Sequence, residues 1–398
     1  SAASDVYKRQ AHSTFVTLSG DLLAHSFDCK YKTLLPESTH AGYLSFVEKT
    51  IRYEISSLRK ALPGVPIYVA MGNNDSGCTD YALDPTHDEF LALTARIVAE
   101  ALPAPDRAAV LRDFALGGYY NVPLAHVPNT RLVVLDDVYL SSSYITCTGK
   151  PDPAPAAAQL DWLQTQLTEA SNLHQRVWVV AHIPPGVNLY ASARKLMTLC
   201  MGSQPQMFLG SEQLEEILAA NADVVRLALF GHTHSDEIRL LLPERTTDNV
   251  EQSTPPLGVP VKIVASITPV NGNNPSFTLA TIDPATATLA DYTVIAASNS
   301  LGDATTQWAP SYTYSATYHQ PAFDSTALLT LISALQADPG ATTPASQAYL
   351  QNYAPGEPSP ILQLAWPQYT CSLNHDSAAA FTACSCAATP ASPQAGIP

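Results

Sequence analysis

The chain has 398 residues, of which 46% are hydrophobic, so it can bury the core of one large α/β domain and a smaller unit. Its formal net charge is -15 with only 20 lysines and arginines and no basic stripe, which argues against a nucleic-acid-binding surface. Its apolar runs are too short to span a membrane, so we expect no transmembrane segment. Seven scattered cysteines and 32 prolines indicate an exported protein with disulfides, and we expect it to be secreted or periplasmic.

The two ends of the chain differ from its middle. Residues 1–10 read like the in-frame translation of a transposase adapter used to prepare sequencing libraries. We expect them to be an artefact outside the fold, with the native N-terminal segment and any signal peptide lying upstream. Residues 389–398 contain mostly Pro, Ala and small polar residues and are expected to form an unfolded tail.

Five segments are predicted to be helices. The clearest, at 41–62, places Leu44, Val47 and Ile51 at the spacing of three and four residues that is typical of one helix face. The predicted helices lie at 41–62, 87–102, 156–171, 211–221 and 325–337, with Ser211 as the N-cap of the fourth. Cys29 is expected in a loop, and 243–260 is expected to be a mobile polar loop.

Apolar runs bounded by turn residues predict the strands. Five of them lie at 14–19, 67–71, 130–135, 177–181 and 224–230, and three more, at 261–266, 277–282 and 289–295, are expected to form a second sheet. Asp136 and Asp137 are expected to form a turn after 130–135.

Four of these strands end beside side chains that bind metals. These side chains are Asp21 after 14–19, Asn73, Asn74 and Asp75 after 67–71, His182 after 177–181, and His232 and His234 after 224–230. Alternate side chains of an extended segment point the same way, so the last two histidines can reach one point or two neighbouring points. Because ligand sites in open α/β sheets form outside the carboxyl ends of strands, we expect these groups to form a divalent-metal site.

The order of these motifs resembles a known family. G-D, G-N-x-[DE], a single His after a strand and G-H-x-H occur in this order in the calcineurin-like metallophosphoesterases. Residues 20–25 (GDLLAH), 181–186 (AHIPPG), 231–237 (GHTHSDE) and 266–269 (SITP) are most similar to the acid sphingomyelinase-like phosphodiesterase branch. The resemblance covers about 14–295 and extends more weakly to Cys386.

The resemblance implies an α/β fold, a four-layer α/β/β/α sandwich of two mixed sheets. It also implies a short strand at 119–123 and a small, mainly helical, cysteine-containing C-terminal unit. We expect a catalytic domain at 11–300, which lacks the first strand of the family and its D-x-H motif, and a C-terminal unit at 301–388.

The resemblance also assigns metal ligands. Asp21 would bridge two divalent metals, with zinc expected first and manganese or iron as alternatives. Asn73, His182 and His232 would complete one metal shell, and His234 would belong to the other. Because the D-x-H pair is missing, the second site retains only two protein ligands, and we expect at most one tight metal and impaired activity.

The catalytic acid is where the sequence departs from the family. Most relatives have a histidine at the position of Asn74, and an asparagine cannot donate a proton as an acid. His25, four residues after the bridging Asp21, matches a histidine that lies near the leaving group in the sphingomyelinase branch. Asn74 and His25 are therefore the candidate catalytic positions, and Asp75 is expected to orient other groups.

The expected function is hydrolysis of a small phosphate ester or phospholipid by a hydroxide bound to two metals. The alternatives are an endopolyphosphatase-like hydrolase, since such relatives also carry G-N-N-D, or a non-catalytic binding relative. We expect a monomer. We also expect disulfides between Cys371 and Cys384 or Cys386, between Cys147 and Cys200 and, as a weaker expectation, between Cys29 and Cys78.

Overall fold

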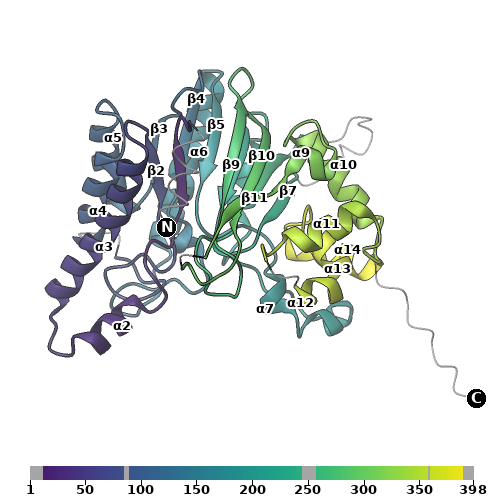
Figure 1. Ribbon diagram of the computed structural model, residues 1–398, viewed down its shortest axis with the longest axis horizontal. Helices are drawn as coiled ribbons and strands as arrows, with labels where there is room; N and C mark the ends of the chain where they lie inside the picture. Colours follow the sequence, from purple (N-terminus) through teal and green to yellow (C-terminus); the bar gives the residue numbers. More distant parts are fainter. Residues whose placement is uncertain (1–11, 85–88, 244–256, 304, 357–358, 389–398) are drawn as a thin grey trace, which may run out of the picture.

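The computed structural model describes residues 12–84, 89–243, 257–303, 305–356 and 359–388, which form layers of sheets and helices (Figure 1). The strands are β1 (Val16–Ser19), β2 (Ile67–Ala70), β3 (Tyr120–Pro123), β4 (Thr130–Val134), β5 (Arg176–Val180), β6 (Val225–Phe230), β7 (Glu237–Leu241), β8 (Val259–Ile263), β9 (Ser276–Asp283), β10 (Thr288–Ala297) and β11 (Trp308–Thr313). Helices of the first three quarters are α2 (Phe27–Leu34), α3 (His40–Ala61), α4 (Glu89–Glu100), α5 (Arg107–Gly117), η1 (Asp137–Leu140), α6 (Ala154–Asn172), α7 (Leu189–Ser192), η2 (Leu196–Met201) and α8 (Gln213–Ala220). The remaining helices are α9 (Tyr314–Tyr318), α10 (Ser325–Gln336), α11 (Pro344–Asn352), α12 (Pro360–Leu364), α13 (Trp366–Cys371) and α14 (Ala378–Ala388).

A six-stranded mixed sheet forms the centre, in the order β3-β4-β5-β6-β8-β7. Its four inner strands are parallel, and β3 and β7 pair antiparallel at the two edges. Both faces are covered, which explains why β5 reads as a continuous apolar run. Val177 and Val179 face the core shared with α6 and α8, whereas Trp178 and Val180 face the larger core on the other side.

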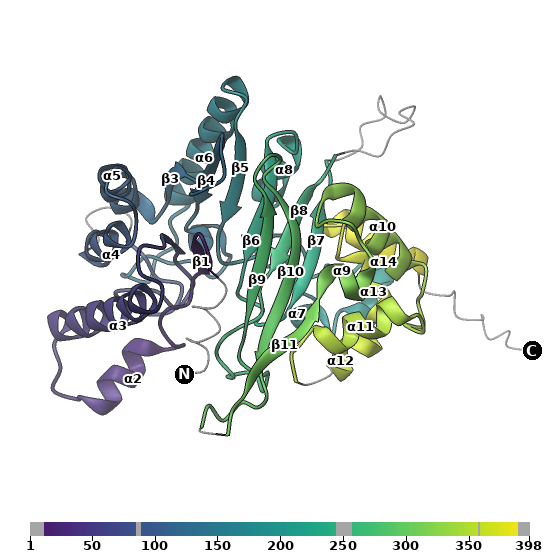
Figure 2. The same ribbon diagram turned by 45° about the horizontal axis from the view of Figure 1, so that its top comes forward.

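The second layer lies on that other face and is divided into two sheets. β1 and β2 form a parallel pair, and β9, β10 and β11 form an antiparallel sheet in front of β6 (Figure 2). Trp178 of β5 lies beneath both, because its ring contacts Phe15 and its Nε1 donates a hydrogen bond to the Ala287 carbonyl at 2.7 Å. Among the described residues, β1 pairs only with β2, and β9 pairs only with β10.

Helices α6 and α8 cover the outside of the central sheet, and α3 and α4 pack on the side of the β1–β2 pair. The predicted four-layer α/β/β/α sandwich is therefore confirmed, with its second sheet divided. The amphipathic pattern at 41–62 forms α3, whose buried face includes Leu44, Val47 and Ile51. The other predicted helices and all predicted strands are also present, although residues 87–88 of one helix lie outside the described part. No helix in the described part of the chain is long and apolar enough to cross a bilayer.

The C-terminal helices pack against the edge strand β7 (Figure 1). The Tyr349 hydroxyl accepts a hydrogen bond from the Ile238 backbone at 3.3 Å, and the Tyr369 hydroxyl donates one to Glu237 at 3.1 Å. The sequence before these helices still belongs to the sandwich, because β11 pairs with β10 although it follows the predicted domain boundary at 300.

Several local predictions are wrong. The run at 261–266 becomes β8, which pairs with β6 and β7 in the central sheet and not in the second one. Cys29 lies in α2 and not in a loop. The N-cap of α8 is Glu212, without a side-chain cap, and not Ser211. Asp136 and Asp137 lead into η1 and do not form a simple turn.

The disulfides agree with the sequence in one case. Cys371 pairs with Cys384, as one of the predicted alternatives stated. Cys147 pairs with Cys78 and not with Cys200, and Cys200 pairs with Cys386. Cys29 is an exposed free thiol, so its predicted pairing with Cys78 is wrong. The predicted loop at 243–260 lies mostly, and the predicted tail wholly, outside the described residues.

Candidate metal centre

Four candidate ligand atoms from four strand ends meet at one point. The Asn73 Oδ1 lies 2.8 Å from Nδ1 of His232 and 3.1 Å from Nε2 of His182. The same His182 Nε2 lies 3.3 Å from Nδ1 of His232 and 3.3 Å from Oδ2 of Asp21. These four residues thus converge in space, although Asp21 and His232 lie 211 positions apart in the sequence.

The hydrogen bonds around this cluster place the hydrogens of the neutral His182 ring and of the Asn73 amide on atoms that point away from its centre. Nδ1 of His182 lies 2.6 Å from the Ser19 carbonyl, which can only accept, so this nitrogen carries the hydrogen in the neutral ring. The Asn73 amide nitrogen donates to Oδ1 of Asn74 at 2.7 Å, which turns its carbonyl oxygen toward the histidines. The atoms that face one another are therefore electron-pair donors, an arrangement that a cation stabilises.

The electrostatics show that this point favours a positive charge. Burial lowers the pKa of His182, but the carboxylate of Asp21 and its hydrogen bond outweigh burial and raise the pKa to about 9. Burial and the charge of His182 lower the pKa of His232 to about 3. Burial raises the pKa of Asp21, but His182 and the Asn74 backbone outweigh it, so the net pKa is lowered. One positive charge is therefore stabilised at this point, and a divalent cation would supply it while leaving the imidazoles neutral.

The buried polar atoms without a hydrogen-bond partner in the described chain include two at this centre, Oδ2 of Asp21 and Nδ1 of His234. The Asp21 oxygen has only the ion-pair contact with His182 at 3.3 Å. A buried polar atom without a partner is costly, so each needs an explanation such as a bound ion. The residues present therefore fit a divalent-metal site by donor type and by these two orphaned atoms.

The backbone is strained at three of the candidate ligands. Asp21, His232 and His234 have φ values of 58°, 68° and 62°, in the left-handed region that residues with side chains seldom adopt. Such conformations cluster at functional sites, where the surrounding structure holds them in place. Close packing adds a constraint, because a Cβ on Gly72 would lie 2.3 Å from Oδ1 of Asp21. This position therefore requires glycine.

Two buried carboxylates hold the loops that carry the ligands. Asp75 accepts hydrogen bonds from the backbones of Gly72 and Leu23, both at 2.8 Å, and burial together with Asp21 raises its pKa to about 7. Asp137 accepts from the backbone of His182 at 3.2 Å. Burial raises the pKa of Asp137 to about 7 as well. Sequence reasoning missed this role of Asp137, although a carboxylate directly after a buried strand was an available signal.

The two candidate catalytic positions lie in different surroundings. Asn74 is 4% exposed, and its side chain contacts Asn73. The His25 side chain is 54% exposed, and its Nδ1 lies 3.4 Å from Oδ2 of Asp80. One ligand atom each from Asp21, His25 and His234 lie within 4.8 Å of one another, so His25 belongs to the same centre.

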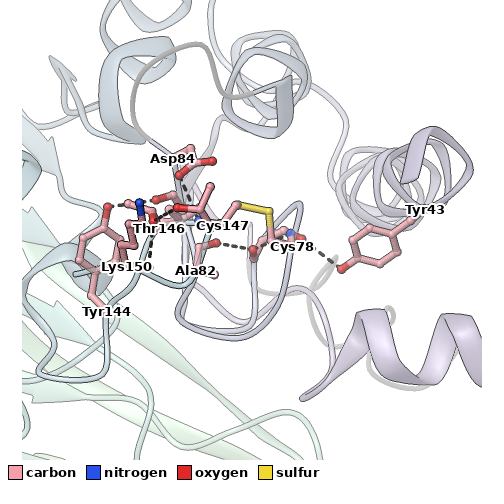
Figure 3. The surroundings of a disulfide bond; sticks show 11 residues. Tyr43, Cys78, Ala82, Asp84, Tyr144, Thr146, Cys147 and Lys150 are labelled. Carbon is pink, nitrogen blue, oxygen red and sulfur yellow. Dashed lines mark hydrogen bonds between the residues drawn. A yellow bond between two sulfur atoms is a disulfide. The ribbon is translucent and has the colours of Figure 1, made fainter. Parts of the chain in front are cut away.

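A disulfide holds the loop that follows Asn73. Cys78 bonds to Cys147, which joins the loop after β2 to the loop after η1 (Figure 3). The Cys147 backbone also donates to Asp84 at 3.0 Å, as Figure 3 shows. The same loop returns to the strand end, because the Tyr81 backbone donates to the Asn73 carbonyl at 2.7 Å. The loop that bears Asn73, Asp75 and Asp80 is thus fixed at both ends.

Comparisons with known proteins agree with this geometry. The human (Homo sapiens) cyclic GMP-AMP phosphodiesterase SMPDL3A is 24% identical over 233 residues, covering 58% of this chain and 46% of that protein. Human sphingomyelin phosphodiesterase is 29% identical over 231 residues, covering 57% and 32%. Human acid sphingomyelinase-like phosphodiesterase 3b is 25% identical over 358 residues, covering 85% and 67%. The chain spans about half the length of the SMPDL3A relatives it matches.

Among solved structures, a dimetal phosphatase from Danio rerio aligns with a TM-score of 0.44 at 13% identity, covering 74% of this chain and 83% of that one. The family model for calcineurin-like phosphoesterases matches residues 4–236. This match takes in more than half of the chain and all of the strand ends described above. The chain therefore belongs to the calcineurin-like phosphoesterase family, as its motifs predicted.

Proposed function

We propose that this protein is an exported, metal-dependent phosphodiesterase that hydrolyses a small phosphate ester or a phospholipid. This proposal rests on one observation. The ligand atoms of four residues meet at one point and face one another as electron-pair donors; these residues are Asp21, Asn73, His182 and His232. Support for a diester comes from the relatives, whose names describe phosphodiesterases. The net charge of -15 also requires bound cations if a phosphate group is to approach.

In this proposal Asp21, Asn73, His182 and His232 hold one divalent cation, and Asp21 and His234 contribute to a second. We expect zinc, with manganese or iron as alternatives, because imidazole and carboxylate ligands suit all three. Divalent cations bound there would polarise the phosphoryl oxygens and lower the pKa of a water molecule.

The remaining residues keep the ligands in place. Asn74 accepts the amide hydrogen of Asn73 and so fixes which atom of that amide faces the centre. The Ser19 carbonyl fixes the tautomer of His182, and Asp137 holds its backbone. Such supporting hydrogen bonds orient metal ligands before a metal binds.

Export is supported by the disulfides. Three pairs join Cys78 to Cys147, Cys200 to Cys386 and Cys371 to Cys384, and such bonds persist in oxidising compartments. We propose a secreted or periplasmic location and a monomer. Mass mapping of peptides under non-reducing conditions tests the three pairs.

Hydrolysis of bis-p-nitrophenyl phosphate tests the function. We expect a rate that a chelator abolishes and that added zinc or manganese restores. Asp21→Asn should lower this rate by at least about a hundredfold, because it removes the charge shared by both cation positions. His40→Ala is the control, since His40 is exposed at the start of α3 and has no contact with the ligand candidates. Metal binding without any hydrolysis would replace the proposal with a non-catalytic binding protein.

A further inference from the structure

A cavity of about 350 Å³ lies at the opposite end of the central sheet from the candidate metal centre. Its wall includes the first residues of the parallel strands β5, β6 and β8, whereas His182 and His232 follow the last residues of β5 and β6. The turn between β9 and β10 and the start of α10 complete the wall. A cavity of this size lies within the range that binds small molecules.

Two arginines line this cavity without a partner for their charge. They are Arg176 at the start of β5 and Arg226 of β6. Within the described ranges, neither guanidinium group forms a hydrogen bond or an ion pair, and the Nε of Arg226 is buried. Leaving a buried donor of a charged group without an acceptor is costly. The cavity therefore offers donors to a ligand that carries acceptor oxygens.

Arg226 lies on a β-bulge. Val225 pairs with Val177 of β5 and Leu227 pairs with Trp178, so Arg226 between them has no opposite residue in the β5–β6 ladder. A bulge changes the direction of the side chain that it carries, and bulges are frequent beside functional sites. The position of Arg226 in the cavity thus depends on a local break in the regular pairing.

The carboxylates near this cavity have donors of their own. Asp324 lines it and accepts a hydrogen bond from the backbone of α10 at 2.9 Å, as the N-cap of that helix. Asp283, whose charge interacts with Arg176, accepts from the Ala285 backbone and from the Thr286 hydroxyl, both at 2.9 Å. Neither carboxylate is bonded to an arginine of the cavity, so both guanidinium groups are available to a ligand.

We propose that this cavity binds a small molecule that bears a phosphate monoester, whose oxygens contact Arg176 and Arg226. Such a group carries a charge of about −1.5 to −2 at pH 7, which two guanidinium groups balance. The planar fork of a guanidinium matches two phosphate oxygens. The N-terminus of the 12-residue α10 also lines the cavity and favours a negative charge. The site is separate from the metal centre and goes beyond the proposed function, because none of the metal-ligand candidates lines it.

Calorimetric titration of the full chain with glycerol 2-phosphate tests the site. We expect one saturable event with a Kd of about 1 mM or tighter. A chelator should leave this event unchanged, because the cavity does not need the metal centre. Arg176→Gln and Arg226→Gln should each weaken binding by about tenfold or more, since each removes charged hydrogen bonds. Arg226→Lys keeps the charge without the fork and should weaken binding less than Arg226→Gln.

Arg59→Gln is the matched control, because it removes the same charge at an exposed position of α3. Equal affinity in the Arg226→Gln and Arg59→Gln chains would overturn the inference, as would a wild-type chain without saturable binding. Binding that the chelator abolishes would place the phosphate at the metal centre and contradict the inference as well. Succinate that binds as tightly as glycerol 2-phosphate would show that the site does not select phosphate. Unfolding of the ligand-free variants at the wild-type temperature shows that a lost event is not a failure to fold.

Discussion

Three of the metal-ligand candidates combine a strand end with a backbone conformation that only a tightly packed site maintains. Asp21, His232 and His234 adopt left-handed backbone angles, and Gly72 leaves room for the Asp21 carboxylate. The sequence predicted that these side chains lie at strand ends, because the apolar runs are continuous and stop at glycines. It could not predict the angles or the short contacts, which depend on strands that are distant in the chain.

Asn74 provides a prediction at this scale. Asn74→Ala removes the acceptor that fixes the Asn73 amide, so the amide is free to turn its nitrogen toward the histidines. We expect cobalt affinity at the first site to fall about tenfold or more, as for other residues that orient ligands. Asn74→Asp keeps the acceptor and should retain the affinity. The pH dependence of any hydrolysis should keep its shape in both variants, and a lost acidic limb would instead make Asn74 part of the proton transfer.

The elements that the sequence missed are those that break simple patterns. β7 is fully buried yet contains Glu237 and Arg239, whose partners come from distant segments: Tyr369 donates to the first, and Arg239 donates to the Pro185 carbonyl at 2.5 Å. β11 contains Pro310, which cannot donate a backbone hydrogen bond to a neighbouring strand, and it lies at a sheet edge beside a register shift. Cysteine pairing has no local signal at all.

The Cys78–Cys147 disulfide gives a prediction for the loop that carries Asn73 and Asp80. The bond joins residues 69 positions apart and constrains the unfolded chain. Replacing both cysteines by serine should lower the free energy of unfolding by about 2–4 kcal/mol. It should also weaken cobalt binding, because the loop ends are released. Cys29→Ser removes the exposed free thiol and should change neither quantity. Denaturant titration and cobalt titration of the variants measure the two effects.

Glu215 of α8 gives a prediction for pH. Burial, with the charges of Asp376 and Glu212, raises its pKa to about 9, although Arg239 opposes this. An unfolded glutamate titrates near ~4.3, so the folded chain keeps a proton that the unfolded chain loses. The contribution of Glu215 to the free energy of unfolding is therefore largest below about pH 4, and it decreases as the pH rises toward 9.

Glu215→Gln should remove that dependence. We expect the unfolding temperature of the wild-type chain to fall between about pH 5 and pH 9, and to fall less in this variant. Glu216→Gln, at the exposed neighbouring position, should behave like the wild-type chain. Identical pH dependence in all three proteins would show that Glu215 is ionised in the folded state.

At the scale of the whole molecule, the divided second layer is the main departure from the expected pair of sheets. Among the described residues β1 and β9 each leave one edge unpaired, on either side of Trp178. Unpaired edges invite pairing with further chains.

The boundary between the sandwich and the C-terminal unit also differs from the predicted one at 301. We propose that the C-terminal unit begins after α9, since β11 belongs to the sandwich.

Four distant strand ends are proposed to form one divalent-cation site. Anomalous diffraction at the zinc absorption edge, from crystals of the full chain grown with zinc, tests this site most directly. We expect a peak about 2 Å from Oδ2 of Asp21, Oδ1 of Asn73, Nε2 of His182 and Nδ1 of His232. A map with zinc peaks only elsewhere, or with none at this point, would contradict it.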